Sequence, residues 1–160
     1  MRALWLALML TACGSKDENA DAGPSAGADQ VSGWTPADQP GPFTAGTAES
    51  TFVGRTGVEM NVQVWYPSMS EDDDLHRYDA LLAFNAVDTP KPACSSTRPV
   101  LAFSHGNQGM RWQSPFLVEH LVSHGFVVVA PDHTGNTVFD YDRSRMPEVT
   151  FRRPFDVIDA

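Results

Sequence analysis

Two unbroken apolar segments that flank an amphipathic one constrain the fold of this chain more than any other feature. The apolar segments span residues 100–103 and 126–130, and such uninterrupted runs are typical of strands covered on both faces of a parallel sheet. Residues 114–125 between them, SPFLVEHLVSHG, open with a Ser–Pro pair suited to a helix N-terminus and close with a Gly suited to its C-terminus. Four apolar side chains fall on one face of this helix: Leu117, Val118, Leu121 and Val122. Strand, helix and strand at this spacing predict a βαβ unit with a right-handed crossover.

An alternating segment precedes this unit. Residues 58–66, VEMNVQVWY, place every second side chain on one face, which is typical of an antiparallel strand with one exposed face. The alternation assigns Gln63 and Trp65 to the exposed, polar face. Residues 47–54 are the expected hairpin partner, with a turn at residues 55–57. A hairpin that leads into a parallel βαβ unit predicts a mixed α/β sheet.

The N-terminus resembles a bacterial lipoprotein signal. Arg2 precedes a short apolar run, which ends in Thr-Ala-Cys-Gly at residues 11–14. The run is too short to span a bilayer, and a positive end followed by a short apolar segment suits the export machinery. The resemblance implies that residues 1–12 are removed and that Cys13 is lipidated, which would anchor the protein to a membrane. An ordinary secretory signal with an incidental Cys is the alternative, and both readings predict export.

The rest of the chain divides into a tether and a domain. Residues 13–43 are rich in Gly, Ala, Ser, Asp and Pro, so they cannot bury enough apolar surface to fold, and a flexible tether is expected. Residues 44–160 remain to form the domain, within which residues 78–84, YDALLAF, are predicted as a short helix. Cys94 would be unpaired in an oxidising compartment, which is unusual. Nothing near it in the sequence would lower its thiol pKa.

Charge and spacing exclude several kinds of site. The formal net charge is −9 and the isoelectric point is near 4.8, and no basic stripe is present, so nucleic acid is not an expected partner. The acidic run at residues 71–74 lacks the ligand spacing of a calcium loop and is expected to be a solvated loop. His120 and His124 have helical i, i+4 spacing but no third ligand nearby, which favours an exposed helix face over a metal site.

Two polar loops follow the apolar runs, where ligands bind in open α/β sheets. They are SHGNQGMRWQ at residues 104–113 and PDHTGNT at residues 131–137. Together with RRPFDVID at residues 152–159, these loops look like the N-terminal half of an α/β-hydrolase. The resemblance covers residues 58–160 and is closest to the secreted dienelactone-hydrolase-like and platelet-activating-factor-acetylhydrolase-like esterases. It implies an ester substrate and no metal or organic cofactor.

The resemblance also implies roles for individual residues. In that family the residue after the His-Gly pair points its backbone N–H at the oxyanion, and here this residue is Asn107. Gly106 would let the backbone approach the substrate, and His105 would orient the loop by hydrogen bonding without acting as a base. Three further side chains are expected to line the substrate site: Gln108, Asp132 and His133.

The catalytic side chains of such an enzyme are not recognisable in this sequence. A serine hydrolase of this kind needs G-x-S-x-G, then an acid, then a His, and no G-x-S-x-G occurs. Ser104 and Ser123 each precede a His, but adjacent residues point to opposite faces, so no Ser–His pair is expected. The helix begun by residues 152–160 would lead to the nucleophile strand, so a truncated and inactive N-terminal part of an esterase is predicted.

Two other functions remain open at this point. A non-catalytic surface lipoprotein that binds a ligand or partner would fold cooperatively on its own, whereas a truncated domain would aggregate. A nucleotide-binding Rossmann unit is the weaker alternative, because HGNQG at residues 105–109 has neither the G-x-G-x-x-G spacing nor a P-loop Lys.

Overall fold

The computed structural model describes residues 35–160, apart from residues 72–73, 80 and 94–96. Cys13, Cys94, the signal segment and most of the predicted tether therefore lie outside the described residues. Within the described part, no helix is both long enough and apolar enough to cross a membrane.

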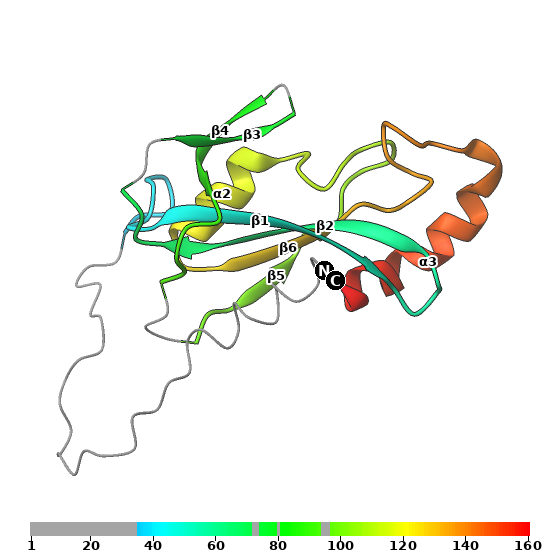
Figure 1. Cartoon of the computed structure of the whole chain (residues 1–160), viewed down its shortest axis with the longest axis horizontal. Helices are drawn as coiled ribbons and strands as arrows, with labels where there is room; N and C mark the ends of the chain where they lie inside the picture. The colour runs from blue at the N-terminus through cyan, green and yellow to red at the C-terminus, as the bar shows by residue number, and fades with distance from the viewer. Residues whose placement is uncertain (1–34, 72–73, 80, 94–96) are drawn as a thin grey trace, which may run out of the picture.

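A six-stranded mixed sheet forms the centre of the molecule, with strand order β3-β4-β1-β2-β6-β5 (Figure 1). The strands are β1 (Thr44–Val53), β2 (Glu59–Ser68), β3 (Leu75–Tyr78), β4 (Leu81–Asp88), β5 (Val100–Ala102) and β6 (Val127–Pro131). The helices are α2 (Pro115–Ser123), the short 3-10 turn η1 (Arg143–Arg145) and α3 (Met146–Asp159). The pairs β1–β2, β2–β6 and β3–β4 are antiparallel, and β1–β4 and β5–β6 are parallel. The predicted mixed α/β sheet is confirmed.

The predicted hairpin is present as β1 and β2. Its register pairs Thr47 with Trp65 and Val53 with Glu59. Gly57 adopts φ +75° in the connecting turn, a conformation that glycine reaches without steric cost, and its N–H donates to the Gly54 carbonyl at 2.9 Å.

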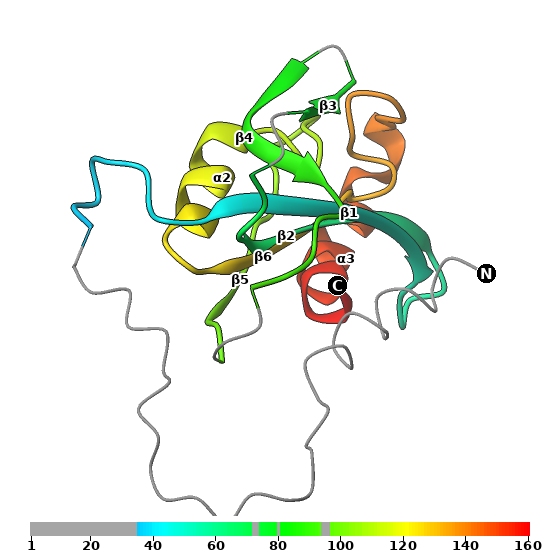
Figure 2. The ribbon, with the colours of Figure 1, turned by 60° about the vertical axis from the view of Figure 1, so that its left-hand side comes forward.

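The βαβ unit is also present as β5, α2 and β6, with Leu101 beside Val128 in parallel register. Figure 2 shows α2 lying against the sheet. One detail of the predicted helix face is wrong. Leu117 is 44% exposed, whereas Glu119 is buried and accepts a hydrogen bond from the Asn85 N–H of β4.

The prediction that Gln63 and Trp65 face solvent is wrong, because β2 is a central strand. Both side chains are fully buried. Trp65 belongs to the core cluster that includes Val118 and Val122 of α2. The Gln63 amide donates to Thr47 Oγ1 at 2.7 Å. The polar face of β2 is thus exposed at Glu59 and Asn61, whereas from Gln63 onward both faces of the strand are covered.

The prediction of a helix over residues 78–84 is also wrong, because Tyr78 ends β3 and residues 81–84 belong to β4. β4 continues the sheet beside β1, with Ala86 in parallel register with Ala45. Tyr78 is buried in the core, and its hydroxyl accepts a hydrogen bond from Trp65 Nε1 at 2.6 Å. Tertiary pairing overrides a local sequence that favours helix.

The apolar run of β5 is not covered on both faces, contrary to prediction. β5 is an edge strand that pairs with β6, and Val100 is 66% and Leu101 37% exposed. Apolar side chains on an edge strand are a ready surface for pairing with further polypeptide.

Helix α3 begins at Met146, earlier than predicted, because Pro147 suits the first helical turn. In Figure 1 it lies at the end of the sheet away from α2. Its buried residues include Arg152 and Asp156, while Phe151 is exposed. α3 therefore turns two charged side chains inward beside the buried Val149.

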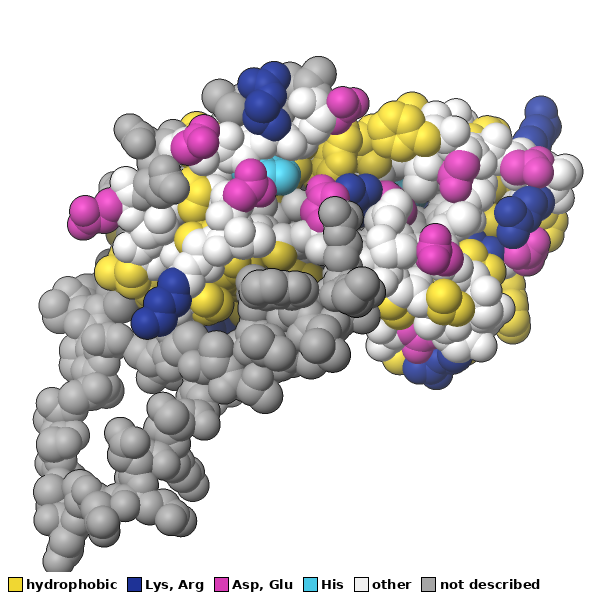
Figure 3. Space-filling model, in the orientation of Figure 1, with side chains coloured by type: hydrophobic (Ala, Val, Ile, Leu, Met, Phe, Trp, Pro, Cys, Tyr) yellow, Lys and Arg dark blue, Asp and Glu magenta, His cyan; other side chains and the backbone are white. Residues whose placement is uncertain are grey.

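Charged side chains are distributed over the surface rather than gathered. On the face drawn in Figure 3, acidic side chains are spread out and basic side chains lie scattered between them. This agrees with the absence of a basic stripe in the sequence.

Candidate active site

The loops after β5 and β6 meet at one end of the sheet, as the parallel pairing of these strands requires. Gly109 and Thr137 form an isolated parallel bridge between the loops, and the Val138 N–H donates to the Gly109 carbonyl at 3.1 Å. The Gln108 N–H donates to Asn136 Oδ1 at 3.2 Å. The two loops that the sequence singled out are therefore one connected structure.

Asn107 occupies the first central position of a tight turn. The Gly109 N–H donates to the Gly106 carbonyl at 3.1 Å, and Gln108 adopts φ +56°, which suits the second central position of a type II turn. Asn107 is exposed, and within the described residues no hydrogen bond is made by its N–H. This N–H is therefore available to an oxyanion.

The two glycines of the loop differ in what they permit. The Gly106 N–H donates to Gln113 Oε1 at 2.8 Å, and a Cβ at Gly106 would meet the end of that side chain at 3.4 Å, which is ordinary contact. A Cβ at Gly109 would lie 2.2 Å from Gln113 Oε1 and 3.1 Å from the Gly106 carbonyl oxygen. Within the described residues, close packing requires glycine at position 109 rather than at 106.

His105 is buried, and its ring bonds to the loop after β5 at Gly106 and to the loop after β6 at His133. Its Nδ1 lies 2.7 Å from the Gly106 carbonyl oxygen, and its Nε2 accepts the His133 N–H at 3.0 Å. These partners assign the proton to Nδ1. Burial lowers the pKa of His105 against the opposing effect of the Gly106 carbonyl, so the ring is neutral near pH 7.

Asp132 is buried and fixes the first loop to the second. Its carboxylate accepts from the Arg111 N–H at 2.7 Å and from Arg111 Nη1 at 2.6 Å. Arg111 also contacts Glu49 of β1 at 3.0 Å. Gln108 is exposed, whereas Asp132 and His133 are not, so of the three expected lining residues only Gln108 reaches the surface of the described chain.

His133 is the centre of a hydrogen-bonded chain of three side chains. Its Nε2 lies 2.8 Å from Ser104 Oγ, and its Nδ1 lies 2.9 Å from Asp156 Oδ2. His133 is 0% and Asp156 1% exposed, whereas Ser104, directly after β5, is exposed. The order Ser, His, Asp is that of a serine nucleophile, its base and the orienting acid.

Two arginines of α3 surround this chain of side chains. Arg153 Nη2 donates to Ser104 Oγ at 3.0 Å and to the His105 carbonyl. Arg152 Nε lies 3.4 Å from Asp156 Oδ1, and its Nη2 donates to the Thr134 carbonyl. Helix α3 thus supplies the acid and both cations.

Ser104 does not pair with the His that follows it in the sequence, as expected, but it does pair with a His from another loop. Its partner is His133, 29 residues later in the chain, and not the adjacent His105. Ser123 behaves as expected, since its hydroxyl donates to the His120 carbonyl at 2.7 Å. Arg152 and Asp156 have i, i+4 spacing on the inner face of α3. This spacing was the signal in the sequence for Asp156 as the acid, because buried charges need partners.

His120 and His124 lie on α2 with their ring centroids 4.8 Å apart. Their Nε2 atoms lie 2.7 Å from the Ala37 carbonyl and 2.9 Å from the Gln39 carbonyl, so both rings hold residues 35–42 against the helix. No group of three or more His, Cys, Asp or Glu side chains suited to a metal is found in the described residues.

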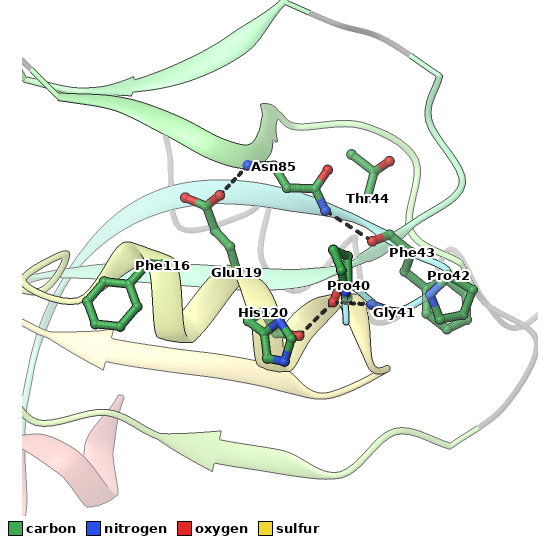
Figure 4. Close-up of a pocket in the computed structure, with 10 residues that line it drawn as sticks. Pro40, Gly41, Pro42, Phe43, Thr44, Asn85, Phe116, Glu119 and His120 are labelled. Carbon is green, nitrogen blue, oxygen red and sulfur yellow. Dashed lines mark hydrogen bonds between the residues drawn. The ribbon is translucent and has the colours of Figure 1, made fainter. Parts of the chain in front are cut away.

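A groove of about 480 Å³ lies between this segment and α2 (Figure 4). Ser123 Oγ accepts the Gly41 N–H at 2.8 Å, and Asn85 Nδ2 donates to the Phe43 carbonyl at 3.2 Å. These polar groups of the groove are thus hydrogen-bonded to one another. The groove lies against α2, away from the loops after β5 and β6.

Comparison with known proteins supports the fold. No protein-family profile matches the sequence, and no curated protein sequence matches it. Among solved structures, a ferulic acid esterase from Streptomyces cinnamoneus is similar, with a TM-score of 0.51 and 24% identity. The alignment covers 60% of this chain and 34% of the esterase chain. The described residues therefore share the architecture of about a third of that larger protein.

Proposed function

We propose that this chain forms the N-terminal part of a carboxylic-ester hydrolase and supplies one of its two oxyanion donors. The observation that carries the proposal is the exposed Asn107 N–H, which has no partner among the described residues and sits in a turn fixed by Asn136, Gln113 and His105. A donor fixed in this way needs no reorganisation when negative charge develops. One such donor contributes about 3 kcal/mol of transition-state stabilisation.

In the proposed reaction a serine attacks the ester carbonyl, a His takes the serine proton, and an acid orients the His. The Asn107 N–H binds the resulting oxyanion together with the N–H of the residue after the nucleophile. The neutral His105 ring cannot serve as the base, because its Nδ1 proton and its Nε2 lone pair are both engaged within the loop. Its relatives are proposed to include secreted dienelactone-hydrolase-like and platelet-activating-factor-acetylhydrolase-like esterases.

The nucleophile strand is proposed to lie in polypeptide that follows this part of the fold. Val100 and Leu101 of the β5 edge and Phe151 of α3 are exposed apolar groups that such polypeptide would cover. The similar esterase is consistent with this arrangement, since the match covers only 34% of its chain.

Export and lipid anchoring are proposed from Arg2, the short apolar run after it and residues 10–13. Labelled palmitate should be incorporated into the wild-type protein and lost in Cys13→Ala. Equal labelling of the two would remove the lipid anchor from the proposal.

The DNA downstream of the last codon provides the first test. Translated in three frames, it should encode G-x-S-x-G followed by an Asp and a His. In the resulting longer protein, Asn107→Pro should lower kcat for a p-nitrophenyl ester by roughly 100-fold or more, because it removes the N–H donor, and Pro suits this position of the turn. Asn107→Ala, which keeps the N–H, is the matched control and should retain activity. Equal activity of the two variants would contradict the oxyanion role.

A further inference from the structure

We propose that Ser104 is a nucleophilic serine, activated by His133 and Asp156, that accepts an activated acyl or phosphoryl group. It is distinct from the G-x-S-x-G serine of the proposed function and does not depend on Asn107. The sequence hides this group because its three members lie in three separate parts of the fold: the loop after β5, the loop after β6, and α3.

The hydrogen bonds set the proton positions that a nucleophile requires. Asp156 is buried and faces His133 Nδ1 at 2.9 Å, so the imidazole proton lies on Nδ1 and points to the carboxylate. Nε2 is left as an acceptor for the Ser104 hydroxyl at 2.8 Å. The serine proton therefore has a base within reach, and the base has an orienting acid.

Arg153 adds a cation on the reacting oxygen. Its Nη2 lies 3.0 Å from Ser104 Oγ, and a guanidinium stays charged in proteins. Burial lowers the pKa of Arg153, and the nearby Asp156 opposes this effect. Negative charge that develops on Ser104 Oγ is thus stabilised by a fixed donor.

Solvent access is confined to the serine end of the group. Ser104 is exposed, whereas His133 and Asp156 are buried. A reagent can reach the hydroxyl while the base and the acid stay shielded from water, which strengthens their interaction.

A fluorophosphonate is the probe. Ser104 Oγ attacks phosphorus, the new O–P bond replaces the P–F bond, fluoride leaves, and the hydroxyl proton passes to His133 Nε2. The imidazolium that forms is balanced by Asp156. One molecule of probe should attach per molecule of protein, because the phosphonate ester formed on Ser104 is stable and consumes the nucleophile.

The test is labelling of the purified chain with a fluorophosphonate, followed by mass spectrometry of the peptide that carries the probe. Wild type should be modified at Ser104, Ser104→Ala should lose the label, and Asp156→Asn should label at least roughly tenfold more slowly, because the His133 tautomer is no longer fixed. Ser144→Ala is the matched control. It removes another exposed serine, bonded to Asp142 at 2.6 Å, and should label as wild type does.

Circular dichroism of each variant shows whether it is folded, and Ser104→Ala removes only a hydroxyl. Absence of label on folded wild-type protein, or a label on another residue that persists in Ser104→Ala, would overturn the proposal and leave the three side chains with a structural role. This failure can be told apart from failure of the proposed function. A longer protein that hydrolyses esters through G-x-S-x-G while Ser104 stays unlabelled would overturn this proposal and leave the proposed function intact.

Discussion

Buried polar side chains join the loops after β5 and β6 to helix α3. Asp156 contacts both His133 and Arg152, and all three side chains are almost completely buried. A buried ion pair is costly to break, because the group left behind keeps its desolvation cost without its partner. The integrity of the candidate site therefore depends on single residues of α3.

The first prediction at the residue scale concerns Asp156. Asp156→Asn should lower the free energy of unfolding by about 3 kcal/mol, since it removes the buried carboxylate that faces both His133 and Arg152 and leaves Arg152 with the exposed Glu148 as its ion-pair partner. Asp159→Asn on the same helix is the control. It breaks an ion pair with the exposed Arg55, and the free energy of unfolding should fall much less. Urea denaturation measures both, and equal losses would contradict the account.

The second prediction concerns His105 and pH. Burial holds the pKa of His105 below its ordinary value of 6.5, so the unfolded chain takes up a proton before the folded chain does. The stability contribution of the neutral ring is complete above about pH 6.5 and is lost as the pH falls through the folded pKa. The slope of unfolding free energy against pH in this window should fall in His105→Gln, by at most about 1.4 kcal/mol per pH unit.

Gln113→Ala is the control for this slope. It removes the hydrogen bond to the Gly106 N–H without removing a titrating group, so it should lower stability and leave the slope unchanged. The slope is measured by urea denaturation from pH 7 to 5. If His105→Gln has the same slope as the wild type, the buried neutral ring is not the source of the slope.

At the scale of elements, α3 carries a proline in its interior. Pro154 lies within the helix and Pro147 in its first turn. Pro154→Ala restores a backbone N–H to the helix interior and should stabilise the protein by about 1–3 kcal/mol. Pro147→Ala, at a position where proline is favoured, should give no such gain. Thermal unfolding followed by circular dichroism distinguishes the two, and equal shifts in Tm would argue against a continuous α3.

The elements that the sequence predicts correctly are those whose signal is local. The β1–β2 hairpin has its turn glycine, and the βαβ unit has a Ser–Pro start and two apolar runs. β3 and β4 were missed because the pairing of β4 with β1 and the Trp65–Tyr78 hydrogen bond are long-range. The Ser104–His133–Asp156 group was missed for the same reason, since no spacing in the chain relates these three residues before the sheet and α3 bring them together.

At the scale of the whole molecule, the β5 edge should govern self-association. Val100 and Leu101 are exposed on a strand that pairs with β6, and such an edge can pair with another chain. Leu101→Lys should reduce aggregation of the purified protein, measured by light scattering. Phe116→Lys is the control, because Phe116 is 61% exposed but lies on helix α2 and not on a strand edge. Equal effects of the two would assign the aggregation to apolar surface in general.

The two proposals together describe a half-sheet that carries an oxyanion donor and one reactive serine, while the nucleophile for turnover lies elsewhere. Steady-state hydrolysis of p-nitrophenyl butyrate by purified residues 14–160 tests this most directly. The account predicts at most about one equivalent of p-nitrophenol per chain, from Ser104, and no continuing turnover, since the proposed nucleophile for turnover does not lie in these residues. Continuing hydrolysis that a serine-directed reagent abolishes would contradict it.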